Sequence, residues 1–258
     1  MSNQKNVLSS KVLWTLSVII ALTAFTINPA SAKHKLKVLI FCKTAGYHHS
    51  SIATGVVAIQ KLGAENNFDV DSTTDGRKFT VENLKQYAAV IFLSTTHDVL
   101  DEAQQKAFIH YIESGGGFMG IHAATDCEYN WQWYGNLVGA YFQSHPAQQE
   151  AVIDVVDSTN IATAHLPRHW KRFDEWYNFK WIEPNLHILL TIDESTYKSL
   201  GVNTPYHPMA WYHEYDGGRA FYTELGHTDE SYADPLYLKH ILGGIKYAMG
   251  IYTPKSTN

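Results

Sequence analysis

Cysteine and basic side chains are both scarce in this sequence. Only Cys42 and Cys127 occur among 258 residues, so the chain is not a small disulfide-held scaffold, and its length allows one domain to bury a full core. The sequence leaves open whether the two thiols pair, because it does not give their separation. Lysine and arginine number 20 against 25 aspartates and glutamates, for a net charge of −5. This balance excludes nucleic acid as a partner, because phosphate binding requires a basic surface.

No apolar run is long enough for a comfortable transmembrane helix. Residues 12–27 form a short apolar run that follows Lys5 and Lys11 and precedes Ala30-Ser31-Ala32, the small-residue pattern of a cleavage site. We therefore predict a secretory signal peptide over residues 1–32, with an uncleaved anchor as the less favoured interpretation. The mature chain, residues 33–258, is expected to be a single domain without a stable membrane anchor, in a periplasmic or secreted location.

Short apolar segments alternate with amphipathic ones through the first half of the chain. Residues 37–42 are almost continuously apolar, as expected for a strand covered on both faces. The predicted strands are 37–42, 68–73, 88–94, 118–121, 150–156 and 187–192, with a hairpin of 210–215 and 219–224. The predicted helices begin at Ser50 or Ser51, cover 81–87, begin again at Asp101, and cover 131–138 and 235–249. The alternation predicts a three-layer, flavodoxin-like α/β fold with a mostly parallel central sheet and an added β-hairpin.

Histidine is abundant, with fourteen residues, and many of these lie in loops after predicted strands. Ligands of open α/β sheets bind beyond the carboxyl ends of the strands. We therefore expect at least three members of one set to share a pocket: His48, His97, His122, His145 and His227. A second set is expected to be surface or hydrogen-bonded structural residues: His49, His165, His169, His187 and His240.

The segment Gly115-Gly116-Gly117-Phe118-Met119-Gly120-Ile121-His122-Ala123-Ala124-Thr125-Asp126 predicts a buried strand, a tight turn and a helix. A serine or cysteine at the turn would indicate an acyl-transfer enzyme, because such a turn displays one side chain at the edge of the sheet. His122 stands there instead and can be a base, an acid or a metal ligand. No compact motif such as His-Glu-x-x-His is present, so a metal site remains an open alternative.

Several motifs together resemble the ThuA-like (trehalose utilisation) family. They are Gly46-Tyr47-His48, the segment 115–126, His145-Pro146, Asp174-Glu175-Trp176-Tyr177, Pro208-Met209-Ala210-Trp211 and the segment 218–227. The resemblance covers roughly residues 37–250 and implies a fold similar to the class I glutamine amidotransferases. Those enzymes use a cysteine at the turn, whereas His122 replaces it here and Cys127 lies five residues beyond. The resemblance therefore excludes glutaminase chemistry by the usual route.

The resemblance also implies an enzyme of carbohydrate metabolism that acts on a glycoside or keto-glycoside by hydrolysis, elimination or isomerisation. The catalytic residues are then expected to be His122, oriented by Asp126, together with His227 and His48. The substrate-binding residues are expected to be Tyr47, His97, Glu175, Tyr177, Trp211 and Arg219. An equal alternative is that Arg219 is a structural hydrogen-bond donor and Glu175 is its partner.

Two further expectations concern cofactors and the type of reaction. A divalent metal, zinc or manganese, is the alternative to acid–base roles for the histidines, and its ligands would be His48, His122, His145 and His227. Direct hydrolysis requires two carboxyl groups flanking the bond, for which the candidates are Asp174, Glu175 and Glu224. The alternative function is a non-catalytic sugar-binding protein on a degenerate amidotransferase-like fold.

Overall fold

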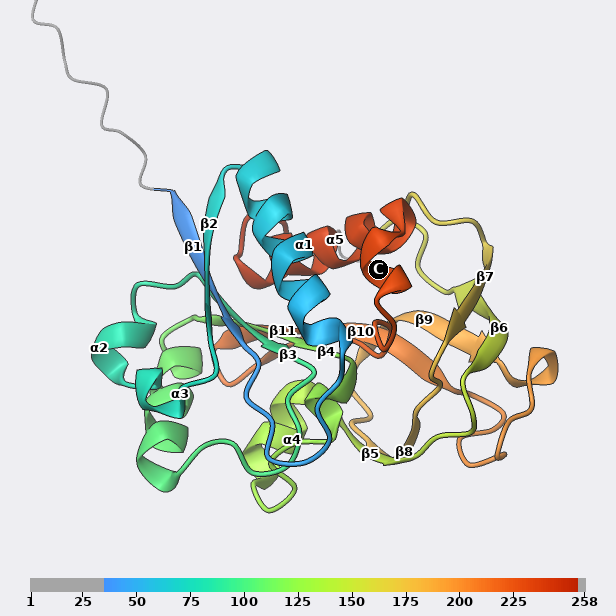
Figure 1. Ribbon diagram of the computed structural model, residues 1–258, viewed down its shortest axis with the longest axis horizontal. Coiled ribbons are helices and arrows are strands. Elements are labelled where there is room, and N and C mark those ends of the chain that lie inside the picture. The colour runs from blue at the N-terminus through green and yellow to red at the C-terminus, as the bar shows by residue number, and fades with distance from the viewer. Residues whose placement is uncertain (1–34, 255–258) are drawn as a thin grey trace, which may run out of the picture. The chain divides into compact units, whose positions relative to one another are not determined.

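A computed structural model describes residues 35–254, so the predicted signal peptide lies outside the described part of the chain. The centre of the fold is a nine-stranded sheet with the order β2-β1-β3-β4-β11-β10-β9-β6-β7 (Figure 1). Its first five strands are mutually parallel. They are β2 (Phe68–Thr73), β1 (Leu36–Phe41), β3 (Ala89–Leu93), β4 (Gly117–Ile121) and β11 (Gly218–Thr223).

The second half of the sheet is antiparallel throughout. It contains β10 (Pro208–Tyr215), β9 (His187–Asp193), β6 (Gln149–Val155) and β7 (His169–Asp174). Four reversals of direction separate β11 from β7, so β7 points the same way as β4 and β11. The strands β5 (Ala140–Ser144) and β8 (Asn178–Ile182) form a separate antiparallel pair.

Helices cover both faces of the sheet, which gives three layers (Figure 1). One face carries α1 (Ser51–Glu65) and α5 (Pro235–Ala248), and the other carries α2 (Val81–Leu84), α3 (Glu102–Glu113) and α4 (Gln132–Val138). Short 3₁₀ turns are η1 (Gly76–Lys78), η2 (His122–Thr125), η3 (Glu194–Thr196) and η4 (Glu230–Ala233). The α3 helix begins with a reciprocal capping box between Asp101 and Gln104.

The core has two halves because successive residues of a strand point to opposite faces of the sheet. In β1, Val38 and Ile40 pack into the cluster beneath α1 and α5. Leu39 and Phe41 pack into the other cluster, beneath α2, α3 and α4. All four are buried, which explains why this strand is continuously apolar in the sequence.

The predicted three-layer α/β fold with a mostly parallel central sheet and a hairpin of β10 and β11 is confirmed. Three strands were missing from the prediction: β5, β7 and β8. The helix expected directly after His122 is instead the short turn η2, and α4 follows only at Gln132. Cys42 and Cys127 are both buried free thiols. Among the described helices, none has the length and apolarity needed to span a bilayer.

Candidate active site

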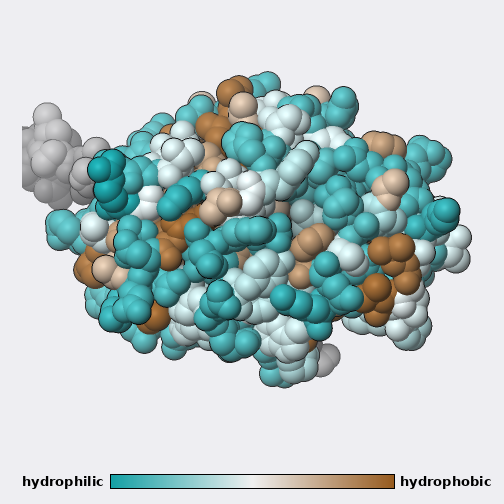
Figure 2. All heavy atoms as spheres, turned by 60° about the horizontal axis from the view of Figure 1, so that its bottom comes forward, coloured by the Kyte–Doolittle hydropathy of each residue, from teal (hydrophilic) through white to brown (hydrophobic). Residues whose placement is uncertain are grey.

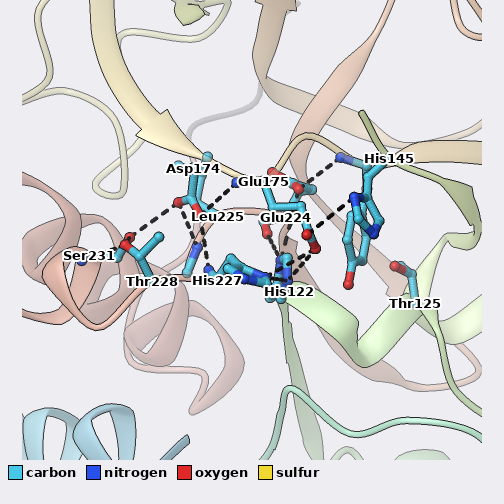
Figure 3. A network of polar contacts seen from close by, with 12 residues as sticks. His122, Thr125, His145, Asp174, Glu175, Glu224, Leu225, His227, Thr228 and Ser231 are labelled. Carbon is cyan, nitrogen blue, oxygen red and sulfur yellow. Dashed lines mark hydrogen bonds and ion pairs between the residues drawn. The ribbon is translucent and has the colours of Figure 1, made fainter. Parts of the chain in front are cut away.

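Four side chains converge beyond the carboxyl edge of the sheet, three of which are drawn in Figure 3. His49 lies between β1 and α1, His122 directly follows β4, Glu175 directly follows β7, and His227 lies after β11. Each offers one possible ligand atom, and these atoms lie within 4.8 Å of one another. The topology explains the convergence, because β1, β4, β7 and β11 all point in one direction. We call these four residues the histidine–glutamate cluster.

His122 is fully buried, and both of its ring nitrogens have partners. Its φ of +52° lies in the left-handed region, which is uncommon for residues other than glycine and often marks a functional position. Its Nδ1 donates to the backbone carbonyl of Glu224 at 2.8 Å, and its Nε2 faces Nδ1 of His227 at 3.1 Å. The expected orientation by Asp126 is therefore not the contact observed. The Asp126 carboxylate instead accepts a hydrogen bond from the Tyr129 hydroxyl at 2.6 Å.

Glu175 connects three imidazole rings through its carboxylate (Figure 3). Its Oε2 lies 3.1 Å from Nδ1 of His227 and 3.5 Å from Nε2 of His122, and its Oε1 lies 3.2 Å from Nδ1 of His145. Burial raises the pKa of Glu175, but the adjoining rings of His122 and His227 outweigh it and hold that pKa well below its usual value. Burial, followed by the neighbouring His122 and His227, lowers the pKa of His49 to about 3. Near neutral pH the cluster therefore combines a carboxylate with the neutral ring of His49.

Asp174 fixes the backbone that carries two members of the cluster (Figure 3). It is fully buried and accepts hydrogen bonds from the N–H groups of Glu175 at 3.1 Å, Gly226 at 3.0 Å and His227 at 3.0 Å. The guanidinium of Arg172, itself buried, lies 3.4 Å from the same carboxylate. Asp174 thus ties the end of β7 to the loop after β11, which brings Glu175 and His227 together.

Glu224 is a second fully buried carboxyl group, located beneath His122. Its Oε1 accepts a hydrogen bond from the N–H of Tyr177 at 3.0 Å, and its Oε2 has no partner within residues 35–254. Burial, followed by the nearby Asp174 charge, raises the pKa of Glu224 well above its usual value. This buried position therefore favours the uncharged form of the Glu224 carboxyl group.

A cavity of about 370 Å³ opens onto the cluster. The Tyr47 ring, 65% exposed, stands edge-on to the His49 ring with a centroid distance of 4.8 Å. The Tyr177 ring lies 4.4 Å from the ring of His122. Exposed aromatic rings offer flat apolar faces to a ligand. The cavity is lined by Tyr47, His49, Asp126, Phe142, His145, Gln148, Glu175, Tyr177 and His227.

The molecular face that lies at the bottom of Figure 1 is largely hydrophilic (Figure 2). Hydrophobic residues appear there only as small, separate areas. Broad apolar patches mark permanent protein interfaces. This face therefore gives no support to a role as a structural partner in an obligate complex.

Most of the residues predicted from the sequence lie around this cavity or in the cluster beneath it. These are Tyr47, His122, Asp126, His145, Glu175, Tyr177 and His227. His49 also belongs to the cluster, which differs from the surface or structural role predicted for it from the sequence. The adjacent pair His48-His49 contains no signal that separates the two residues, because only the local path of the chain into α1 decides which ring turns inward.

Four predicted residues lie elsewhere. His48 and His97 are exposed, and the His48 ring contacts the Thr44 hydroxyl at 3.2 Å. Trp211 is fully buried, and its indole N–H donates to the last carbonyl of α4. Arg219 stands at the start of β11, at the opposite edge of the sheet, where it donates to two backbone carbonyls. It borders a different cavity, of about 440 Å³, which contains no member of the cluster.

Comparisons with known proteins concern the family and the fold of the chain. Residues 37–248 match the family model of ThuA, described as trehalose utilisation. A ThuA-like protein from Bacteroides uniformis ATCC 8492 is similar in structure with a TM-score of 0.71 and 25% identity, covering 85% of this chain and 94% of that chain. A ThuA-like protein from Parabacteroides merdae ATCC 43184 gives a TM-score of 0.69 and 20% identity, covering 86% of this chain and 93% of that chain.

A more distant likeness concerns the fold alone. The β-galactosidase from Rahnella sp. R3 gives a TM-score of 0.55 and 14% identity, covering 83% of this chain but 31% of that chain. A comparison with proteins of curated function gave no match. The family match spans nearly all of the described residues and agrees with the resemblance seen in the sequence motifs. This chain therefore belongs to the ThuA (trehalose utilisation) family.

Proposed function

We propose that the protein is an enzyme that transfers a proton at the carbon next to the ketone of a small keto-glycoside, leading to elimination or isomerisation. The observation that carries this proposal is the cavity itself, which joins the histidine–glutamate cluster, one separate carboxyl group and aromatic rings, of which that of Tyr47 is exposed. Membership of a family named for trehalose utilisation supports a carbohydrate as the substrate.

Asp126 is the group that takes the proton. It lines the cavity, is half-buried, and has no salt bridge among the described residues. Burial raises the pKa of Asp126 despite the hydrogen bond from Tyr129. A raised pKa makes a carboxylate a better base near neutral pH, and a C–H bond beside a ketone is acidic enough for such a base.

The histidine–glutamate cluster acts on the ketone oxygen. Removal of the neighbouring proton places negative charge on that oxygen, and preorganised polar groups in a site shielded from water stabilise such charge strongly. His227 lies on the cavity wall, and the buried Asp174 fixes its backbone. Tyr47 and Tyr177 supply the apolar walls for the sugar ring.

Direct glycoside hydrolysis has less support, because it requires two carboxyl groups on either side of the bond. Asp174 is occupied by three backbone N–H groups, and Glu224 is buried away from the cavity. Glu175 lies within 3.5 Å of three imidazole rings. Asp126 is thus the one lining carboxyl group not engaged by the cluster.

Hydrogen–deuterium exchange tests this proposal independently of the final product. The full-length protein is incubated with a 3-keto-glucoside in D₂O, and the signal of the proton beside the ketone is followed by NMR. We expect catalysed exchange, reduced about 10²- to 10⁴-fold in Asp126→Asn because a general base contributes that much. The exposed Asp98 provides the matched control, and Asp98→Asn should exchange like the wild type.

Binding of the same keto-glucoside, measured by calorimetry, separates the remaining possibilities. Asp126→Asn should bind within about threefold of the wild type, because the substitution preserves size. A wild-type protein that binds the sugar without any catalysed exchange would contradict the enzyme proposal and leave a sugar-binding protein.

We also propose that the protein is exported to the periplasm or medium through the segment 1–32, based on its sequence pattern alone. N-terminal sequencing of the protein recovered from the host periplasm should begin near Lys33. An intact Met1 on protein confined to the cytoplasm would contradict export.

A further inference from the structure

We propose that the histidine–glutamate cluster is a binding site for one divalent transition metal, with His49, His122, His227 and Glu175 as its ligands. The inference deepens the proposed function, on which its catalytic meaning rests, by placing a Lewis acid beside the same cavity. The ligand geometry itself is independent of the substrate.

Three ligand atoms already form a near-regular triangle. The edges are 3.1 Å from His122 Nε2 to His227 Nδ1, 3.5 Å from His122 Nε2 to Glu175 Oε2, and 3.1 Å from His227 Nδ1 to Glu175 Oε2. In a tetrahedral zinc site with bonds of about 2.0–2.1 Å, neighbouring ligand atoms lie about 3.3–3.4 Å apart. A metal ion placed roughly 1 Å above the plane of this triangle therefore reaches all three atoms at normal bond lengths.

The outer hydrogen bonds set the rings up as ligands. A carbonyl oxygen only accepts hydrogen bonds, so the bond from His122 to the Glu224 carbonyl at 2.8 Å places the proton on Nδ1 and leaves the Nε2 lone pair toward the cluster. Nε2 of His227 contacts the side-chain amide of Gln148 at 2.7 Å, so its Nδ1 is the nitrogen that faces the cluster. Metal-bound histidines almost always engage their second nitrogen in this way.

His49 provides a second, independent observation. Its Nδ1 is buried and has no hydrogen-bond partner within the described part of the chain, although an unpaired buried polar atom costs about 1–3 kcal/mol. One of its ring nitrogens lies within 4.8 Å of the other three ligand atoms. A metal ion bound through Nδ1 would give this atom a partner, whereas a network of protons shared by His122, His227 and Glu175 would leave it without one.

Two residues of the predicted ligand set are replaced in this proposal. His48 is exposed and contacts Thr44 instead of the cluster. His145 contacts the other oxygen of Glu175 at 3.2 Å and lies on the cavity wall, so it orients the carboxylate and faces the substrate. His49 and Glu175 take their places as ligands.

The donor set favours zinc. Imidazole nitrogens suit zinc, iron, nickel and copper, whereas manganese prefers sites dominated by oxygen, and the cluster has three imidazoles to one carboxylate. A bound zinc ion would polarise a substrate carbonyl oxygen as a Lewis acid. His49, His227 and Glu175 all line the cavity, so an ion held by them would be next to the position proposed for the ketone.

Zinc titration of two neighbouring alanine variants tests the site. The full-length protein is treated with a chelator, dialysed and titrated with Zn²⁺ by calorimetry, in parallel with His49→Ala and His48→Ala. We expect one Zn²⁺ per chain, affinity at least about tenfold weaker in His49→Ala, and wild-type affinity in His48→Ala. Circular dichroism verifies that each variant is folded, and Glu175→Gln serves as a second ligand variant if His49→Ala does not fold.

Cobalt substitution adds a readout that depends on the ligands and not on activity. Co²⁺ bound by this set should give the intense visible absorption of a four- or five-coordinate ion, and Glu175→Gln should alter that spectrum.

The proposal is overturned if the wild type binds neither Zn²⁺ nor Co²⁺, or if His48→Ala and His49→Ala weaken binding equally. The proposed reaction has a separate test. Zinc binding without proton exchange refutes the keto-glycoside reaction and leaves the metal site standing. Proton exchange by a wild-type protein that binds neither Zn²⁺ nor Co²⁺ supports the reaction and refutes the metal site.

Discussion

Replacing Asp174 with asparagine should both destabilise the protein and disorder its site. Asparagine keeps the size of aspartate but replaces one carboxylate oxygen by an NH₂ group, which cannot accept a hydrogen bond. Oδ1 accepts the N–H groups of Glu175 and His227, and Oδ2 accepts the N–H of Gly226 and the hydroxyl of Ser231. Either orientation of the amide therefore faces at least one backbone donor with another donor.

The magnitude follows from the burial of the ion pair. The Arg172 side chain is 4% exposed and that of Asp174 is 0% exposed, and removal of one partner from a buried pair costs about 3–5 kcal/mol. Arg172 keeps its second partner, Asp234, at 2.7 Å, which favours the lower end of this range. Domains of 150–250 residues lose about 2–4 °C in Tm per kcal/mol, so we expect Tm to fall by about 6–20 °C.

Urea unfolding at pH 7 measures this loss, with Asp154→Asn as the matched control. Asp154 pairs with His169 at the surface, where such pairs contribute about 0–1 kcal/mol. A loss below about 1 kcal/mol in Asp174→Asn would refute the assignment of Asp174 as the tie between β7 and the loop after β11.

Three further predictions concern pH, packing and the cavity. Burial lowers the pKa of His240 to about 4, so between pH 6.5 and 4 the unfolded state binds one more proton than the folded state. The free energy of unfolding therefore falls by up to about 1.4 kcal/mol for each pH unit of acidification. His240→Asn should reduce this pH dependence, measured by urea unfolding at several pH values. Gly117→Ala should lower the free energy of unfolding, measured in urea, by at least about 1–3 kcal/mol, because its Cβ would lie 1.9 Å from the Ala248 carbonyl oxygen. Tyr47→Ala should leave Tm unchanged while weakening keto-glucoside binding several-fold in calorimetry, because its ring is 65% exposed above the cavity.

The strands found from sequence are mostly those buried on both faces. β1, β3 and β4 are continuous apolar segments, because helices cover both sides of the parallel half of the sheet. β7 has the opposite character: its residues alternate between exposed and buried, and its exposed positions include His169 and Lys171. It lies at the edge of the sheet and carries charge on its outer face, so a search for apolar runs passes over it. The absence of β7 from the predicted strands affected the site, because Glu175 reaches the cluster from the end of β7.

Arg219 was predicted to bind substrate, but it lies far from the cluster although it is close to His227 in the sequence. The motif from Gly218 to His227 is continuous in the chain, which invited the prediction that Arg219 and His227 serve one site. The motif includes the whole of β11, however, and each residue of a strand adds about 3.3 Å. From Arg219 to Glu224 the chain therefore advances roughly 17 Å, from one edge of the sheet to the other. Arg219 consequently holds backbone carbonyls at the amino edge, while Glu224 and His227 serve the cluster at the carboxyl edge. In a parallel sheet the carboxyl ends of separate strands meet, so His122 and His227 are neighbours across 105 positions whereas Arg219 and His227, eight positions apart, are not.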